Sequence, residues 1–186
     1  MNKLNSNFKL EKYGLEVRFV EEKDGQFILG LRTDSRLGRY ISETSLDVLQ
    51  QVEWIRNYKL REERGKEYYF IYSYEGESVG VNRIYNIDDM KREAVGGSFV
   101  FKKGCLIELP ILATLIQFDI AFNMLGIDCM LGDIRKRNRK VVKFHKILKV
   151  DFTGSDDLNF YYEYGRNVFN DVKTKLDLIL LPINEK

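Results

Sequence analysis

The sequence predicts an α/β protein that forms a single domain around a mixed sheet. Three observations support this: the chain of 186 residues has the length of one domain, three consecutive strand-like segments precede alternating helices and strands, and 44% of the residues are hydrophobic. The apolar content is sufficient for a core, so wholesale disorder is excluded. Residues 1–12 are expected to be a flexible segment or an edge of this domain.

The N-terminal part is predicted to contain one strand and two helices. Leu15–Val20 has the composition of a strand, and the apolar residues of Gln26–Thr33 recur at helical spacing. Thr44, followed three residues later by Asp47, resembles a capping box that opens a longer helix ending near Arg64.

The middle of the chain predicts a strand meander followed by a long helix. Glu75-Gly76 is a hairpin turn between the first two of three strands, which are Glu67–Tyr74, Ser78–Tyr85 and Glu93–Lys102. Glu108–Leu125 is a strongly apolar helix, and Gly126 is placed to cap its C-terminus.

The C-terminal part predicts a strand at Ile127–Ile134, a basic helix at Arg139–Lys149, a strand at Val150–Phe152 that continues in Asn159–Gly165, and a last strand at Leu176–Leu181. Three antiparallel strands that lead into a β-α-β-α unit give a twisted, mostly antiparallel sheet with helices on its flanks. The sheet has one parallel pair, which flanks the long helix. Ligands of open sheets bind where neighbouring strands part, so the site is expected at this pair.

The net charge of +2 conceals one strongly basic segment. Arg135–Lys149 holds eight Lys and Arg residues and no Asp or Glu, whereas the rest of the chain has 22 basic and 28 acidic residues. Clustered cations favour a polyanion such as a nucleic acid, a phosphorylated cofactor or an anionic surface, and a solvated helix face is the alternative. Phe144 and His145 are the only side chains in the segment with rings, which argues against nucleic-acid binding.

Other function classes are excluded by composition. One histidine and two cysteines cannot supply a standard zinc site, so no metal is expected. The first residues lack the apolar segment of a signal peptide. The longest apolar segment, Leu109–Ile127, contains Gln117, Asp119 and Asn123, which a membrane-spanning helix rarely carries. A cytoplasmic protein without membrane contact is expected.

Four features together resemble a known family. They are Val79-Gly80 after the hairpin turn, the strand Glu93–Phe101, the passage Ala121–Ile127 from helix to strand, and Asn138 followed by Val141–Leu148. From about Leu15 to Leu181 the chain is similar to the GNAT superfamily of N-acetyltransferases. The resemblance implies acetyl-coenzyme A as co-substrate and a primary amine on a small molecule as acceptor.

The resemblance to a particular subgroup of the GNAT superfamily depends on three shorter segments. Leu31–Asp34, Tyr40–Ser45 and Gln51–Ile55 resemble members that acetylate nucleotide-linked amino sugars or protein N-termini, so both acceptors stay open. The phosphate loop Lys102–Ile107 has a single glycine where the family usually has two small residues. A non-catalytic acyl-coenzyme A-binding module is therefore a further alternative. The C-terminal strands offer an edge on which relatives often dimerise, which allows a homodimer.

The resemblance also implies roles for individual residues. Backbone amides of Phe99, Val100 and Phe101 would hold the acyl carbonyl. The other coenzyme contacts would come from Lys103, Gly104, Asn138, Arg139, Lys140 and Lys143. Asn138 is also a candidate N-cap of the basic helix.

Catalytic and acceptor roles are assigned in the same way. Glu93 is the first candidate for the base that takes the amine proton, against a solvent-facing strand residue as the alternative. His145 is the candidate proton donor to the leaving sulfur, against a ring packed beside the sheet. The acceptor pocket would be formed by Arg32, Tyr40, Trp54 and Asn82, although aromatic residues near a cleft often belong to the core.

Overall fold

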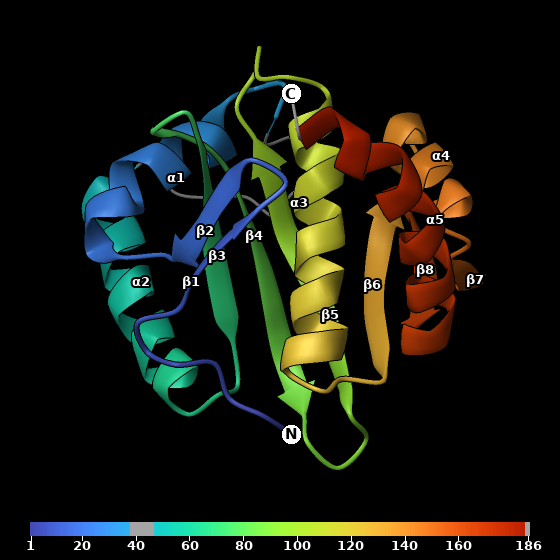
Figure 1. Ribbon diagram of the computed structural model, residues 1–186. Helices are drawn as coiled ribbons and strands as arrows, with labels where there is room; N and C mark the ends of the chain where they lie inside the picture. The colour runs from blue at the N-terminus through green and yellow to red at the C-terminus, as the bar shows by residue number, and fades with distance from the viewer. Residues whose placement is uncertain (38–46, 185–186) are drawn as a thin grey trace.

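The structure is a computed structural model that describes residues 1–37 and 47–184, with side chains described as far as Leu176. Within these residues, strands form one sheet in the spatial order β1-β2-β3-β4-β5-β6-β8-β7 (Figure 1). The strands are β1 Lys9–Lys12, β2 Leu15–Phe19, β3 Tyr68–Tyr74, β4 Glu77–Asp88, β5 Glu93–Phe101, β6 Cys129–Arg135, β7 Asp151–Ser155 and β8 Asn159–Gly165. The helices are α1 Gly25–Thr33, α2 Val48–Glu63, α3 Glu108–Asp119, α4 Arg139–Ile147 and α5 Arg166–Asn184.

The sheet has the mixed topology that the sequence predicts. Every neighbouring pair is antiparallel except β5 and β6, which are parallel. Because parallel strands need a crossover connection, the long helix α3 lies between them in the chain and crosses the front of the sheet in Figure 1, beside α5. The predicted fold class is confirmed.

The alternation of side chains along β3 divides the core between the two faces of the sheet. Phe70 and Tyr72 belong to the larger core cluster, which includes the apolar side chains of α3. Tyr69 and Ile71 belong to a second cluster, which includes the buried residues of α1 and α2. The helices α1 and α2 therefore cover the face of β3 opposite to α3.

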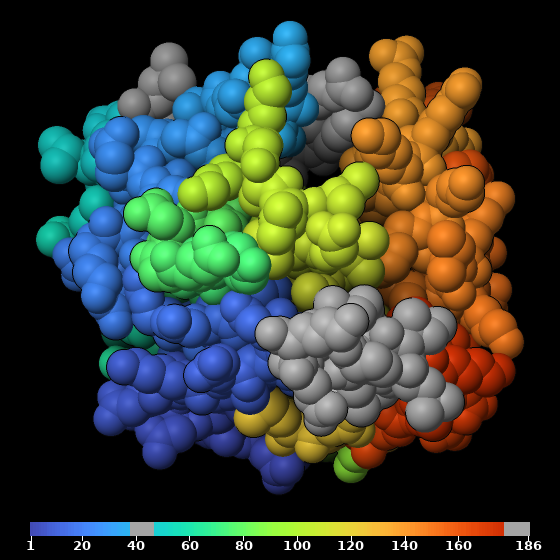
Figure 2. Space-filling model, turned by 45° about the horizontal axis from the view of Figure 1, so that its top comes forward, coloured from blue at the N-terminus to red at the C-terminus, as the bar shows by residue number. Residues whose placement is uncertain are grey.

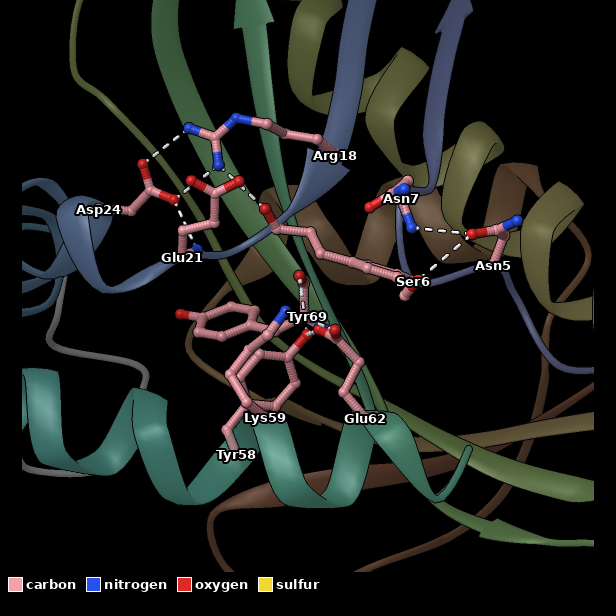
Figure 3. Close-up of polar contacts among 11 residues, drawn as sticks. Asn5, Ser6, Asn7, Arg18, Glu21, Asp24, Tyr58, Lys59, Glu62 and Tyr69 are labelled. Carbon is pink, nitrogen blue, oxygen red and sulfur yellow. Dashed lines mark hydrogen bonds and ion pairs between the residues drawn. The ribbon is translucent and has the colours of Figure 1, made fainter.

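Buried polar contacts fix α1 and α2 against the sheet, as Figure 3 shows. The Tyr58 hydroxyl of α2 donates to Glu62 and accepts a 3.0 Å hydrogen bond from the backbone N–H of Tyr69. Arg18 of β2 donates to both carboxylate oxygens of Asp24 at 2.7 and 2.8 Å, just before α1.

The parallel pair separates after three residues. β5 and β6 pair at Glu93–Val95 and Cys129–Leu131, and beyond these residues β5 stays with β4 whereas β6 stays with β8. Ser98 has a φ of 49° at an irregularity in the β4–β5 register, a bulge that bends β5. The gap between Gly96–Phe101 of β5 and Gly132–Arg135 of β6, here called the wedge, confirms the predicted splay.

The prediction of a C-terminal strand at Leu176–Leu181 is wrong, because these residues lie in the helix α5. Phe169 and Val172 are buried, and Leu176 packs against the same core, which is the three- and four-residue spacing of a helix. A short apolar segment taken alone does not distinguish a strand from a buried helix.

Two helix ends also bear on the predictions. α2 begins after Asp47, whose side chain accepts a hydrogen bond from the backbone N–H of Leu49, so Asp47 is the N-cap. The predicted cap, Thr44, lies outside the described residues. Leu125 caps the π-helical turn Ile120–Met124 that continues α3, and Gly126 after it has a φ of 79°, as expected of a helix-terminating glycine.

In the described part of the chain, no helix combines the length and hydropathy needed to cross a bilayer. The same residues include no group of three or more His, Cys, Asp or Glu side chains arranged to hold a metal ion.

Candidate functional site

A cavity of about 970 Å³ occupies the wedge. Gly96 and Phe99 of β5 line one side of it, and Asp133 and Arg135 of β6 line the other. Its walls also include residues of α1 and α2 and residues of α3 and α4, which places parts of the cavity on both faces of the sheet. The parted strands thus provide a passage through the sheet. Figure 2 shows the surface hollowed between the segment after β5 and the region of α4.

The N-terminal end of α3 lies at this cavity. Ile107 occupies the N-cap position without a side-chain capping bond and lines the cavity. Within the described residues, the backbone amides of Ile107 and Glu108 make no hydrogen bond. Unpaired amides and the helix dipole together form an anion site, so this end fits the pyrophosphate of a coenzyme. The predicted residues Lys103 and Gly104 are exposed in the adjoining loop and do not line the cavity.

The basic helix α4 contributes less of its charge to the cavity than the sequence suggests. Asn138 and Lys140 line the cavity, whereas Arg139 and Lys143 are exposed outside it. Asn138 stands at the N-cap position of α4, yet its side chain makes no capping hydrogen bond. The Asn138 side chain is therefore available for a ligand.

The three β5 residues that were predicted to hold the acyl carbonyl lie in different environments. Phe99 lines the cavity, Val100 belongs to the core cluster beneath α1 and α2, and Phe101 belongs to the cluster beneath α3. Gly96, Gly97 and Ser98 also line the cavity. The cavity wall is therefore formed by the bulge and the two glycines before it, and the last two residues of β5 do not line it.

His145 is buried beside the cavity. Its side chain is 8% exposed and lines the cavity wall, and its ring centroid lies 5.1 Å from that of Tyr162. Burial lowers the pKa of His145 below its ordinary value, while a contact between Nδ1 and the Val141 carbonyl oxygen opposes this shift. A buried, neutral imidazole can accept a proton, whereas proton donation was predicted for this ring from the sequence.

Glu93 is not part of the site. It begins β5 at the closed end of the parallel pair, opposite Cys129, and does not line the cavity. The structure therefore does not bring Glu93 together with His145. The alternation of side chains along a strand does not reveal where that strand separates from its neighbour. Glu93 was therefore predicted to lie near the cleft, although it lies where β5 and β6 are still paired.

At the face of the sheet covered by α1 and α2, the cavity is lined by cations and rings. Arg32 and Trp54, both predicted, lie here with Arg83 and Tyr85. The Arg83 guanidinium lies 4.3 Å from the Tyr85 ring centroid and 5.3 Å from that of Trp54. Burial raises the pKa of Tyr69, in the same wall, to about 12, and the charges of Arg32 and Arg83 oppose this.

Asn82 does not contribute to this wall. It is fully buried, and its side chain accepts a 3.1 Å hydrogen bond from the Tyr72 hydroxyl and donates to the Ala113 carbonyl at 3.5 Å. The assignment of Asn82 to the acceptor pocket is thus corrected: the residue joins β4 to α3. Tyr40 lies outside the described residues.

Several residues that line the cavity were not predicted from the sequence: Tyr69, Arg83, Tyr85, Gln117, Asp133 and Tyr162. Side chains alternate along a strand, so Arg83 and Tyr85 lie on the face opposite to Asn82. This alternation could have shown that Arg83 and Tyr85 share a face that Asn82 does not, but it does not indicate which face holds the ligand. Asp133 and Tyr162 carry no local motif, because their positions depend on strand pairing.

The cavity therefore extends from the N-terminal end of α3, through the parted strands, to a wall of cations and aromatic rings on the other face of the sheet. The structure of FdhC, described as a nucleotide-linked sugar GNAT, is 31% identical to this chain with a TM-score of 0.83, over 91% of this chain and 97% of that one. The chain belongs to the GNAT family of acetyltransferases, as the sequence motifs predicted.

More distant structures share the fold. The ribosomal-protein-S5-alanine acetyltransferase from Vibrio fischeri is 13% identical with a TM-score of 0.73, over 86% of this chain and 97% of that one. The spermidine N-acetyltransferase SpeG from Vibrio cholerae is 13% identical with a TM-score of 0.70, over 85% and 97%. No family model and no curated protein matches the chain.

Proposed function

We propose that this protein transfers an acetyl group from acetyl-coenzyme A to the primary amine of a nucleotide-linked amino sugar. The observation that carries the proposal is the single cavity that runs through the wedge from the open end of α3 to the wall formed by Arg32, Trp54, Arg83 and Tyr85. One side suits a phosphorylated donor and the other a phosphorylated acceptor. FdhC, the related nucleotide-linked sugar GNAT, supports this choice of acceptor.

On the donor side, the wedge would hold the pantetheine arm. The amides of Ile107 and Glu108 would bind the pyrophosphate, with the charge of Lys140 nearby and the free side chain of Asn138 within the same wall. The coenzyme supplies the acetyl group as an activated thioester. The residues of this chain orient that thioester and exclude water from it.

On the acceptor side, the charge of the wall favours an anionic group. The guanidinium of Arg83 forms an ion pair with the buried carboxylate of Glu67, with 3.2 Å between Nε and Oε1, and lies 4.3 Å from the centroid of the Tyr85 ring. Arginine binds phosphate well, and aromatic rings stack on nucleotide bases. The same cations would repel a polyamine, so an acceptor of the spermidine type is disfavoured.

The reaction requires a C–N bond to form as the C–S bond breaks. The amine loses one proton, the departing thiolate gains one, and no oxidant or reductant takes part. His145 is the proposed acceptor of the amine proton, because its ring lines the cavity and burial keeps it neutral. Asp133, which lines the same cavity from β6, is the second group able to accept a proton there.

Thermal unfolding in the presence of acetyl-coenzyme A and of dephospho-coenzyme A tests the donor. A ligand that binds the native state raises the melting temperature, so acetyl-coenzyme A should stabilise the protein more than the dephospho form does. Thiol release with nucleotide-linked aminohexoses, peptides with free N-termini and polyamines then tests the acceptor. Turnover with the aminohexoses alone is expected.

The other outcomes discriminate between the alternatives. Turnover with peptides instead would establish the protein N-terminus as acceptor within the same chemistry. Stabilisation by acetyl-coenzyme A without thiol release from any amine would favour a non-catalytic binding module. No stabilisation by either nucleotide would overturn the proposal.

A further inference from the structure

The apex of the wedge is occupied by one phenol, that of Tyr162. The last paired residues of β5 and β6 are Val95 and Leu131, and the next residue of each strand is a glycine, Gly96 and Gly132. Tyr162 of β8 pairs with Gly132 and lies across it, since a Cβ on Gly132 would be 2.4 Å from the tyrosine hydroxyl oxygen. A Cβ on Gly96 would be 3.6 Å from the same oxygen.

Both glycines leave the space around the hydroxyl open. A side chain at Gly132 would collide with the phenol, and one at Gly96 would stand against it. Tyr162 is 7% exposed and lines the cavity, so its hydroxyl is accessible from the wedge although the residue is nearly buried. The ring is held beside His145, with centroids 5.1 Å apart.

Within the described residues, the Tyr162 hydroxyl has no hydrogen-bond partner, although the hydroxyl groups of residues this little exposed are usually paired. Burial raises the pKa of Tyr162, and the negative charge of Asp133 raises it further, so the phenol keeps its proton at neutral pH. A protonated, unpaired hydroxyl at the end of a ligand cavity is available as a hydrogen-bond donor.

We propose that the Tyr162 hydroxyl donates a hydrogen bond to the acyl carbonyl oxygen of the donor thioester at the apex of the wedge. This role rests on the proposed function, since the acyl thioester is the group that the wedge would hold. The bond would strengthen as negative charge develops on that oxygen, and it would act beside any backbone amide at the Ser98 bulge. The phenol binds the oxygen and transfers no proton.

The experiment compares wild-type protein with Tyr162→Phe, which removes the hydroxyl and keeps the ring. The first readout is the infrared C=O stretch of acetyl-coenzyme A labelled at the acetyl carbonyl carbon and bound without acceptor. Because a hydrogen bond weakens the carbonyl bond, we expect a lower frequency in the wild type than in the variant. The second readout is turnover, expected to fall by about 10²-fold with the KM for the donor little changed.

Tyr164→Phe is the matched control. The Tyr164 hydroxyl lies two residues further along the same strand, is buried with no hydrogen-bond partner among the described residues, and does not line the cavity. Neither the infrared frequency nor turnover should change in this variant. Gly132→Ala, which forces the phenol out of its position, should reproduce the infrared shift of Tyr162→Phe.

The outcomes separate this role from the proposed function. Equal frequencies and equal turnover in wild type and Tyr162→Phe would overturn the role of Tyr162 alone, provided that both proteins bind acetyl-coenzyme A. Failure of the wild type to bind acetyl-coenzyme A would overturn the proposed function, and the role of Tyr162 with it. A lower frequency in Tyr162→Phe than in wild type would also overturn the role.

Discussion

The Nδ1 atom of His145 lies 2.9 Å from the carbonyl oxygen of Val141, one helical turn earlier in α4. A carbonyl oxygen only accepts hydrogen bonds, so Nδ1 carries the proton of the neutral ring. The other nitrogen, Nε2, then has its lone pair free. This arrangement makes His145 a proton acceptor at neutral pH.

We expect His145→Gln to lower kcat for acetyl transfer by about 10²-fold or more, because a positioned base contributes at least that much, whereas the KM for acetyl-coenzyme A should change little. Steady-state kinetics with both substrates varied measures the two effects. Lys146→Gln, which alters an exposed neighbour outside the cavity, is the control and should leave kcat unchanged. A proportional rise in KM for the donor would instead indicate that the ring only packs against the coenzyme site.

Stability should depend on pH through the same residue. Burial lowers the pKa of His145, so below the ordinary pKa of about 6.5 the unfolded chain binds more protons than the native protein. The contribution of the neutral ring is complete above that pH and is lost as the pH falls toward the folded pKa. Urea unfolding at pH 7.5 and at pH 5.5 should therefore show a smaller loss of stability for His145→Gln than for wild type. Equal losses would contradict the shift.

Lys140 and Lys146 are two exposed lysines of α4, of which only Lys140 lines the cavity. Lys140→Ala should raise the KM for acetyl-coenzyme A about 5-fold, equivalent to ~1 kcal/mol, which is the upper range for an exposed charge pair. The effect should diminish at high ionic strength, because salt screens exposed charges. Lys146→Ala should have no effect on the KM, and similar effects of both variants would show that the whole helix, rather than the cavity wall, attracts the coenzyme.

Gly80 provides space for Phe101 across the β4–β5 pair. A Cβ at Gly80 would lie 2.3 Å from the Phe101 ring, so Gly80→Ala forces the ring and the end of β5 to move. We expect a loss of about 1–3 kcal/mol in the free energy of unfolding, which is typical of overpacking.

Gly30→Ala is the matched control for that substitution. Gly30 lies within α1 and has no atom within 4 Å of an added Cβ. Replacing it should stabilise the protein by about 0.5–1 kcal/mol, because alanine favours a helix over glycine. Urea unfolding of both variants measures the two opposite changes, and destabilisation of equal size in both would contradict the packing argument.

Asn82→Ala should affect stability and leave acceptor binding unchanged. The substitution removes a partner from the buried Tyr72 hydroxyl and from the Ala113 carbonyl, at a cost of about 1–3 kcal/mol. Since Asn82 lies outside the cavity wall, the KM for the acceptor should equal that of wild type. A raised KM in a variant of undiminished stability would restore Asn82 to the acceptor site.

The chain's local patterns predicted the family and the elements from β2 to α4. The turn at Glu75-Gly76, the apolar run of α3 and the glycine after it are read from adjacent residues, because turns, periodicity and caps depend on local conformation. The splay of β5 from β6 was expected from the order of the strands. The strand prediction for Leu176–Leu181 was wrong because a short apolar segment is compatible with either a strand or a helix.

Tertiary structure alone decided which residues meet at the wedge. Neighbours on one strand face opposite sides of the sheet, so Arg83 lines the cavity while Asn82 packs beneath α3. Glu93 lies at the end of β5 that is still paired with β6. The point at which β5 and β6 separate depends on how each of them pairs with its other neighbour. Tyr162 reaches the apex only through its pairing with Gly132, which lies 30 residues earlier in the chain. The local sequence carries periodicity and turns, whereas strand register and the faces of the sheet follow from contacts between distant segments.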